Sequence, residues 1–287
     1  MSRYFENFGI GQYNGEYCRM LTTRTAIAQD VVKLTSAFYP YQLVEGERPD
    51  TISNLYYKDP SLEWLVFFAN DIIDPYYGWY LTNEQFNSYI VDKYGSLAVA
   101  QLKVHHFQVN WVGDDTKLTN AAYQALHSVY PANTKQYWRP LLDEYGATVC
   151  YVRKALDNTT TTNVIMSIAV QSVEGFGVGE LISQEIGGVV TGYGEIEAIT
   201  DNALIIKHVL GAFVADEPVV GFTNAATTTV ASATLIKQNI PSEELIYWRS
   251  ISCYDYEEYL NEQRKILKLI DSGYAEAAQD NLKTMMK

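Results

Sequence analysis

Apolar and polar residues between positions 41 and 79 follow the spacing of one short strand and then of two short helices. Residues 41–44 have strand chemistry, and the turn-forming run EGE follows at residues 45–47. Pro49 and Asp50 open the first predicted helix, with Asp50 as its N-cap. Apolar residues at helical spacing predict its buried face, namely Ile52, Leu55 and Tyr56.

A second helix is predicted to begin at Asp59 and Pro60, since a capping aspartate followed by proline is a favoured helix start. Asn70 is predicted to end it, because asparagine tolerates the left-handed backbone of a helix stop. The predicted buried face of this helix consists of Leu62, Leu65, Val66 and Ala69. Asp74 and Pro75 then lead into an aromatic cluster of Tyr76, Tyr77, Trp79 and Tyr80.

This order of strand, turn, two helices and aromatic exit resembles a LysM-like module. LysM modules carry a turn-rich GDT signature before the first helix, which Gly46 and Asp50 match, and an asparagine that closes the second helix, which Asn70 matches. Three runs are similar, more specifically, to the wedge subunit 53 family of contractile-tailed phage baseplates: EGERPDTIS (45–53), YYKDPSLEWLVFFAN (56–70) and IIDPYYGW (72–79).

Similarity to that family is also found toward both ends of the chain, at residues 4–15, 22–24, 38–41 and 247–271. The resemblance implies a structural, non-enzymatic component of a baseplate wedge, which bridges neighbouring wedge subunits through protein–protein contacts. The implied partners are other baseplate wedge proteins and neighbouring copies of the wedge, in a ring-shaped assembly of several copies. The implied location is the virion tail baseplate, with assembly in the host cytoplasm.

The resemblance also implies that aromatic side chains anchor the protein contacts. The candidate interface residues are Trp64, Tyr76, Tyr77, Trp79, Tyr256 and Tyr259. The residues that carry the module signature are Gly46, Asp50, Asn70, Asp74 and Pro75. Trp64 and Trp79 have a second interpretation, in which they close the small core of the module itself.

The pattern changes between residues 164 and 236, where the chain has one Tyr, no Trp and many Val, Ile, Thr and Gly residues. Short β-branched runs separated by Gly- or Asn-containing turns predict a small all-β barrel or sandwich. The predicted strands include residues 164–170, 203–206 and 227–231. The polar runs 157–163 and 237–244 are predicted linkers, and the shorter family members lack the unit, which therefore looks like an insertion.

Two short repeats support this organisation. V-x-GFGVGE-x-I (173–182) is echoed by V-x-GAFVADE-x-V (209–219), which predicts two similar β-hairpin halves. YWRP (137–140) and YWRS (247–250) bracket the unit, as expected if it is inserted into a host that continues on either side.

The C-terminal segment is predicted to be helical. Asp255 and Glu258 have capping-box spacing, Gly273 is the predicted stop, and a second helix is predicted at residues 275–286. The apolar stripe of the first helix is predicted to be Tyr256, Tyr259, Leu260, Leu267 and Ile270.

The fold class predicted from these patterns is α+β, with an inserted all-β domain. The predicted parts are an N-terminal arm (1–40), a LysM-like module (41–95), a connecting segment (96–163), the all-β domain (164–237) and a C-terminal helical segment (238–287).

Charge and hydropathy exclude several partners. The formal charge is −13, from 34 acidic and 21 basic residues, and no Lys/Arg cluster is found, so neither nucleic acid nor an anionic membrane is an expected partner. The longest apolar run, residues 64–69, is far shorter than the ~20 residues of a membrane helix. Residues 1–20 have no signal-peptide pattern, and Tyr outnumbers Phe by 23 to 10, which suits surfaces buried on assembly.

The sequence offers little catalytic chemistry. There are four histidines and three widely spaced cysteines, without GxSxG, HExxH, P-loop or CxxC motifs, so no metal, cofactor or catalytic residue is predicted. The alternative function is a LysM-type peptidoglycan- or glycan-binding protein. A tail hydrolase is a third interpretation, for which acidic pairs such as those at residues 114–115 and 257–258 would have to supply the catalytic couple.

Overall fold

The computed structural model describes residues 8–20, 35–111 and 117–285, which form a mixture of helices and strands. The chain divides into two compact units, the first made of Met1–Tyr89 and Glu257–Lys287 and the second of Ile90–Tyr256. The similarity noted at residues 22–24, most of the predicted N-terminal arm and the acidic pair 114–115 lie outside the described residues.

The first unit begins with an antiparallel hairpin and continues as two helices beside a two-stranded sheet. Its segments are β1 (Ile10–Tyr13), β2 (Glu16–Arg19), η2 (Thr35–Ala37), β3 (Phe38–Gln42), α2 (Pro49–Tyr57), η3 (Pro60–Leu62), α3 (Glu63–Ala69), β16 (Ile266–Ile270) and α9 (Ser272–Met285). Helices α4 (Asn83–Tyr94) and α8 (Cys253–Gln263) each include residues of both units.

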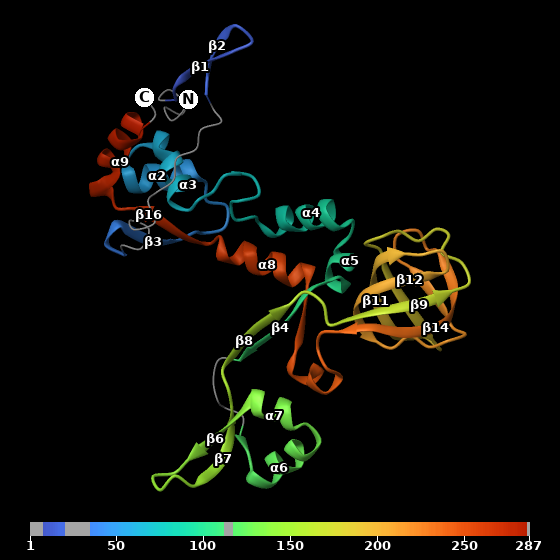
Figure 1. The fold of residues 1–287 in the computed structure, drawn as a ribbon. Coiled ribbons are helices and arrows are strands. Elements are labelled where there is room, and N and C mark those ends of the chain that lie inside the picture. The colour runs from blue at the N-terminus through green and yellow to red at the C-terminus, as the bar shows by residue number, and fades with distance from the viewer. Residues whose placement is uncertain (1–7, 21–34, 112–116, 286–287) are drawn as a thin grey trace. The chain divides into compact units, whose positions relative to one another are not determined.

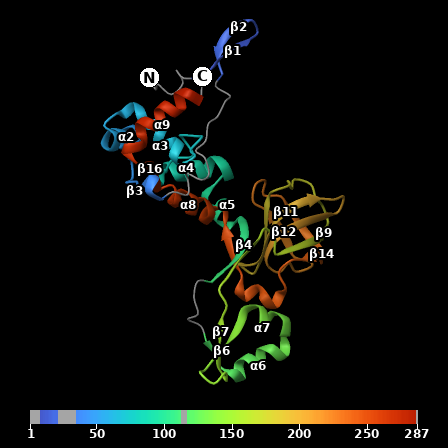
Figure 2. The same ribbon diagram turned by 60° about the vertical axis from the view of Figure 1, so that its left-hand side comes forward.

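Two apolar clusters form the core of the first unit. One joins the sheet to the helices through Leu43, Ile52, Val66, Leu267 and Leu269. The other lies between α3 and α9 and contains Phe8, Leu62, Trp64, Leu65, Ile270 and Ala275. Both ribbon views show α9 beside α2 and α3 (Figures 1 and 2). Segments from the two ends of the chain therefore share one core.

The prediction of one continuous helix from Asp255 to Ile270 is wrong. Helix α8 ends at Gln263, and β16 pairs antiparallel with β3. Buried Leu267 and Leu269 alternate with exposed residues, which is the period-two pattern of a half-buried strand. Gly273 lies near the start of α9, which coincides with the second predicted helix, so it is not the predicted stop.

Capping of α8 also differs from the prediction. The helix begins at Cys253, and the backbone N–H of Asp255 donates to Ser252 Oγ (3.0 Å). Ser252 therefore caps the helix, and Asp255 lies in its first turn, where a negative charge is favoured by the helix dipole.

The second unit contains two three-stranded sheets, ordered β15-β4-β8 and β5-β7-β6. Its non-barrel segments are α5 (Leu97–Leu102), β4 (Val104–Trp111), β5 (Lys117–Leu118), α6 (Asn120–Val129), α7 (Pro131–Tyr137), β6 (Trp138–Leu142), β7 (Thr148–Arg153), β8 (Leu156–Thr160), η4 (Ser242–Tyr247) and β15 (Arg249–Ser252). Residues 157–160, predicted to be part of a linker, belong to β8 and pair with β4.

Residues 164–238 form a closed barrel (Figure 1). Its strands are β9 (Val164–Val170), β10 (Leu181–Ile186), β11 (Val189–Ile199), β12 (Ala203–Gly211), β13 (Pro218–Gly221) and β14 (Thr227–Gln238). Their order is β10-β11-β12-β9-β14-β13, and all neighbours are antiparallel. The predicted all-β unit is therefore a barrel and not a sandwich.

The sequence repeat inside the barrel corresponds to a twofold structural repeat. The two halves are β9–β11 and β12–β14. If β9, β10 and β11 are exchanged with β12, β13 and β14 respectively, each pair of neighbouring strands again becomes a pair of neighbours, so the order around the barrel is unchanged. In the first half, the N–H of Gly179 donates to the carbonyl of Ile196 (2.8 Å). In the second half, the N–H of Asp216 donates to the carbonyl of Val230 (2.8 Å). Gly179 and Asp216 both have positive φ, and both halves bury one phenylalanine in the shared core.

The two YWR words are neighbours in space. The rings of Tyr137 and Tyr247 stack with centroids 4.4 Å apart. Trp248 Nε1 donates to the Tyr137 hydroxyl (3.2 Å), which in turn donates to Glu244 Oε2 (2.5 Å). The chain that leaves the barrel thus packs on the segment that precedes it.

Candidate interaction site

The turn before α2 is fixed by Glu47. Its carboxylate accepts hydrogen bonds from the Tyr41 hydroxyl (2.9 and 3.0 Å) and from the Val44 N–H (2.9 Å). Burial, followed by the hydrogen bond and charge of Glu47, raises the pKa of Tyr41. Trp79 Nε1 donates to the Glu47 carbonyl (3.1 Å), and Gly46 has φ +83°. The turn and the aromatic exit are therefore held together.

The first helix departs from the prediction in two details. Helix α2 begins at Pro49 with Arg48 as its N-cap, so Asp50 lies in the first turn and not at the cap. There it pairs with Arg48 (3.2 Å). Leu55, predicted to be buried, is exposed, whereas Ile52 is buried. The predicted cap of the second helix is confirmed, because Asp59 accepts from the Ser61 N–H (2.9 Å).

Asn70 joins α3 to β16. Its Nδ2 donates to the carbonyls of Val66 (2.8 Å) and Lys268 (2.9 Å), and its Oδ1 accepts from the Lys268 N–H (2.8 Å). The prediction that Asn70 takes the left-handed conformation is wrong, since its φ is −108°. Asp71 adopts that conformation, with φ +57°. The side chain of Asn70 therefore caps the end of the helix, without the left-handed backbone conformation that was predicted.

Asp74 builds the turn that carries the exit tyrosines. Its Oδ1 accepts from the N–H groups of Tyr76 (2.9 Å) and Tyr77 (3.4 Å). Its carbonyl accepts from the Gly78 N–H (2.8 Å), and a Cβ at Gly78 would lie 2.5 Å from that oxygen. Pro75 follows Asp74 in the turn, where its fixed φ is favourable.

The turn presents Tyr76 and Tyr77 to solvent, with exposed fractions of 82% and 52%. The Tyr77 ring also contacts the Tyr89 ring, with centroids 5.4 Å apart. The two exposed tyrosines therefore lie on a turn whose backbone is fixed by hydrogen bonds.

The other predicted interface residues have different surroundings. Trp64 is buried in the core between α3 and α9. Trp79 is half-buried and contacts Phe67 edge-on, with centroids 5.9 Å apart. Tyr259 is exposed in the first unit, and Tyr256, in the second unit, stacks on His105 (3.7 Å between centroids).

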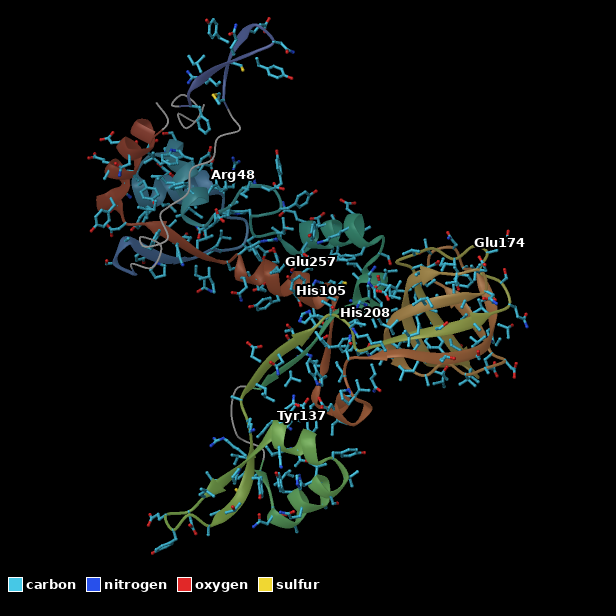
Figure 3. All side chains as sticks on the ribbon, in the orientation of Figure 1. Arg48, His105, Tyr137, Glu174, His208 and Glu257 are labelled. Atoms are coloured by element: carbon cyan, nitrogen blue, oxygen red, sulfur yellow. The ribbon has the colours of Figure 1, made fainter. Side chains whose placement is uncertain are left out.

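Sequence reasoning missed a buried charge cluster at one end of the barrel, where Figure 3 shows His208. Glu195 lies 3.1 Å from Lys103 Nζ and 3.8 Å from Lys207 Nζ, and its Oε2 lies 3.1 Å from His208 Nδ1. His208 Nε2 lies 2.6 Å from the Thr161 carbonyl. The four residues come from three segments, because Lys207 and His208 are consecutive in β12, Glu195 lies on β11 and Lys103 follows α5. No local motif marks the cluster.

Opposing effects act on the Glu195 carboxyl. Burial by itself raises its pKa, but the hydrogen bond with His208 and the charges of Lys103 and Lys207 outweigh burial. The pKa of Glu195 therefore lies below its ordinary value of 4.5. The cluster ties the barrel to the end of α5 and to the chain that leads into β9.

Among the described residues, no set of three or more His, Cys, Asp and Glu side chains is placed to hold a metal ion. Within the same residues, no helix is both long and apolar enough to span a membrane.

Comparison with known proteins gives two matches. Residues 30–154 match the family described as base plate wedge protein 53. Baseplate wedge protein gp53 of Enterobacteria phage T4 is 32% identical over 65 residues, which are 23% of this chain and 33% of that protein. The chain thus spans about a third of the length of this curated relative. The family match contains α2, α3 and the Asp74 turn and ends before the barrel.

Proposed function

We propose that the chain is a structural component of a phage tail baseplate wedge, because residues 30–154 match the base plate wedge protein 53 family. In this proposal it bridges neighbouring wedge subunits through protein–protein contacts and is carried in the virion tail. It performs no catalysis there, and it works in several copies around the tail.

The observation that carries the proposal is the Asp74 turn. It lies inside the segment matched by the family and holds two exposed tyrosines on a scaffold of backbone hydrogen bonds. Exposed, preorganised aromatic residues are typical anchors of protein interfaces. Trp64 and Trp79 pack within the first unit. We therefore assign the partner contact to Tyr76 and Tyr77, and we assign to the two tryptophans a role in the core that supports the turn.

We further infer that β3, α2, α3 and β16 form a LysM-like module that serves protein contact. The strand, the Gly46 turn and the two helices are in the order that this interpretation requires. The second strand, β16, comes from the far end of the chain. A module assembled from two distant segments couples the folding of the C-terminal region to that of the interface.

Co-purification tests the proposed function. The tagged chain is isolated from a lysate that produces the whole tail, and the eluate is identified and quantified by mass spectrometry. We expect other baseplate wedge proteins in a fixed ratio to the chain. A chain recovered without them would contradict the proposal, and sedimentation of that chain with purified cell wall would favour the glycan-binding alternative.

A further inference from the structure

The β6–β7 hairpin carries apolar side chains where strands that face solvent ordinarily carry polar ones. Tyr145 is 93% exposed, Val149 60% and Leu142 54%. These residues lie within eight positions of one another on the distal part of the hairpin. Concentrated apolar exposure on one element marks a surface that becomes buried on assembly.

The base of the hairpin is firmly packed. Trp138 and Val152 are buried, and Tyr151 stacks on Tyr123 of α6 with ring centroids 3.4 Å apart. Figure 1 shows the turn extending away from α6 and α7. The distal residues 139–147 are all exposed. The hairpin is therefore a projecting element on a rigid base.

The turn at the tip is ordered by Asp143. Its Oδ1 accepts from the N–H groups of Tyr145 (2.9 Å) and Ala147 (2.8 Å). The Asp143 N–H donates to the Ala147 carbonyl (2.9 Å), and Gly146 supplies the positive φ of 83°. A fixed turn loses little conformational entropy when its side chain is bound, so Tyr145 is suited to act as an anchor.

Pairing of β6 with a strand of another protein is disfavoured. β6 is the edge strand of its sheet, and it contains Pro140. Proline has no N–H to donate, and its presence on an edge strand is a common protection against strand addition. Recognition is therefore expected through side chains at the tip and not through the backbone of the edge.

The negative charge of the tip indicates which kind of partner surface is complementary to it. Asp143 and Glu144 are the only charged residues between positions 140 and 152. The whole chain has a formal charge of −13, so a second copy is an electrostatically unfavourable partner. The complementary surface is an apolar groove with Lys or Arg at its rim.

We propose that the β6–β7 tip inserts Tyr145 into an apolar, basic-rimmed groove of another protein of the tail. This inference rests on the proposed function, since it places the partner in the same assembly. It adds a second contact, in a different unit of the chain from the Asp74 turn.

The test uses tail assemblies produced without this chain, to which the purified full-length chain is added. We expect Tyr145→Ala to raise the concentration required for half-maximal incorporation by roughly 10- to 30-fold, as for an aromatic hot spot. The matched control is Tyr130→Ala, another exposed tyrosine of the same unit. It is expected to be incorporated like the wild type. Both variants should keep the wild-type thermal transition.

A photo-cross-linking amino acid at position 145 identifies the partner, with position 124 on the exposed face of α6 as control. Cross-links to a tail protein, in a peptide with Lys or Arg beside apolar residues, would support the proposal. Cross-links to a second copy, or equal incorporation of wild type and Tyr145→Ala, would overturn the hairpin proposal alone. A wild-type chain that is not incorporated would overturn the proposed function, and this inference with it.

Discussion

Asn70 pairs with the backbone of Lys268 across 198 positions of sequence, donating to its carbonyl at 2.9 Å and accepting from its N–H at 2.8 Å. The side-chain amide thereby acts as an additional strand residue beside β16. One residue at the end of α3 thus fixes where the C-terminal strand lies in the module.

Asn70→Ala is expected to lower the free energy of unfolding of the first unit by about 1–3 kcal/mol, because three hydrogen bonds lose their partner. Denaturant unfolding, with hydrogen exchange of β16 as a local readout, measures the change. Asn54→Ala, at an exposed site within α2, is the control and should have little effect. Equal stability of the two variants would show that Asn70 does not hold β16.

The double variant Tyr76→Ala/Tyr77→Ala is expected to reduce recovery of other wedge proteins in the co-purification by about tenfold or more. Both side chains are largely exposed, so the thermal transition should remain close to that of the wild type. Tyr274→Ala, an exposed tyrosine on α9 outside the matched segment, serves as control. Unchanged recovery would remove these two residues from the interface.

The barrel cluster is expected to lose stability in acid. The pKa of Glu195 is below 4.5 in the folded chain, so its stabilising effect is fully present above that pH. It is lost as the pH falls through the lower, folded pKa and the carboxylate takes up a proton. Hydrogen exchange of β11 and β12 at decreasing pH follows this loss.

Glu195→Gln should reduce the hydrogen-exchange protection of β11 and β12 near neutral pH. It should also make that protection less dependent on pH in the acidic range. Glu197→Gln, an exposed carboxylate on the same strand, is the matched control and should retain the wild-type profile. If the two variants behave alike, the cluster does not stabilise the barrel.

Removal of the barrel is expected to leave the first unit folded. The two core clusters of that unit contain no residue between 164 and 238. Val164 is paired with Gln238, so the two ends of the barrel are adjacent and a short Gly-Ser linker can replace it. Hydrogen exchange of α2 and α3 in the shortened chain should match the full-length chain. Loss of that protection would show that the units do not fold independently.

Local signals in the sequence predicted the elements that local interactions determine. The structure contains the Asp59 cap, the second helix that ends at Asn70, the barrel strands and the internal repeat. Each of these features is determined within a short stretch of the chain. The two YWR words predicted only that a host chain continues on either side of the barrel; the stacking of Tyr137 on Tyr247 was not predicted.

Long-range pairing explains the main error. Tyr256, Leu260 and Leu267 fit a helical stripe, but the partner strand β3 lies more than 200 residues away and converts residues 266–270 into a strand. The Glu195 cluster was missed partly for the same reason, because Lys103 follows α5 and lies far from β11 and β12 in the sequence. Spacing along one segment carries no information about such contacts.

The twofold repeat of the barrel has a consequence for its origin. Each strand of the first half has the same kinds of hydrogen-bonded neighbours, within its half and across to the other, as the corresponding strand of the second half. A three-stranded ancestor could therefore have closed the same ring as a symmetric homodimer, with no change in pairing. In the present chain, the short turn at residues 200–202 fuses the two halves. Fusion frees each half to diverge, and the ion pair between Glu195 on β11 of the first half and His208 on β12 of the second joins side chains that differ between the halves.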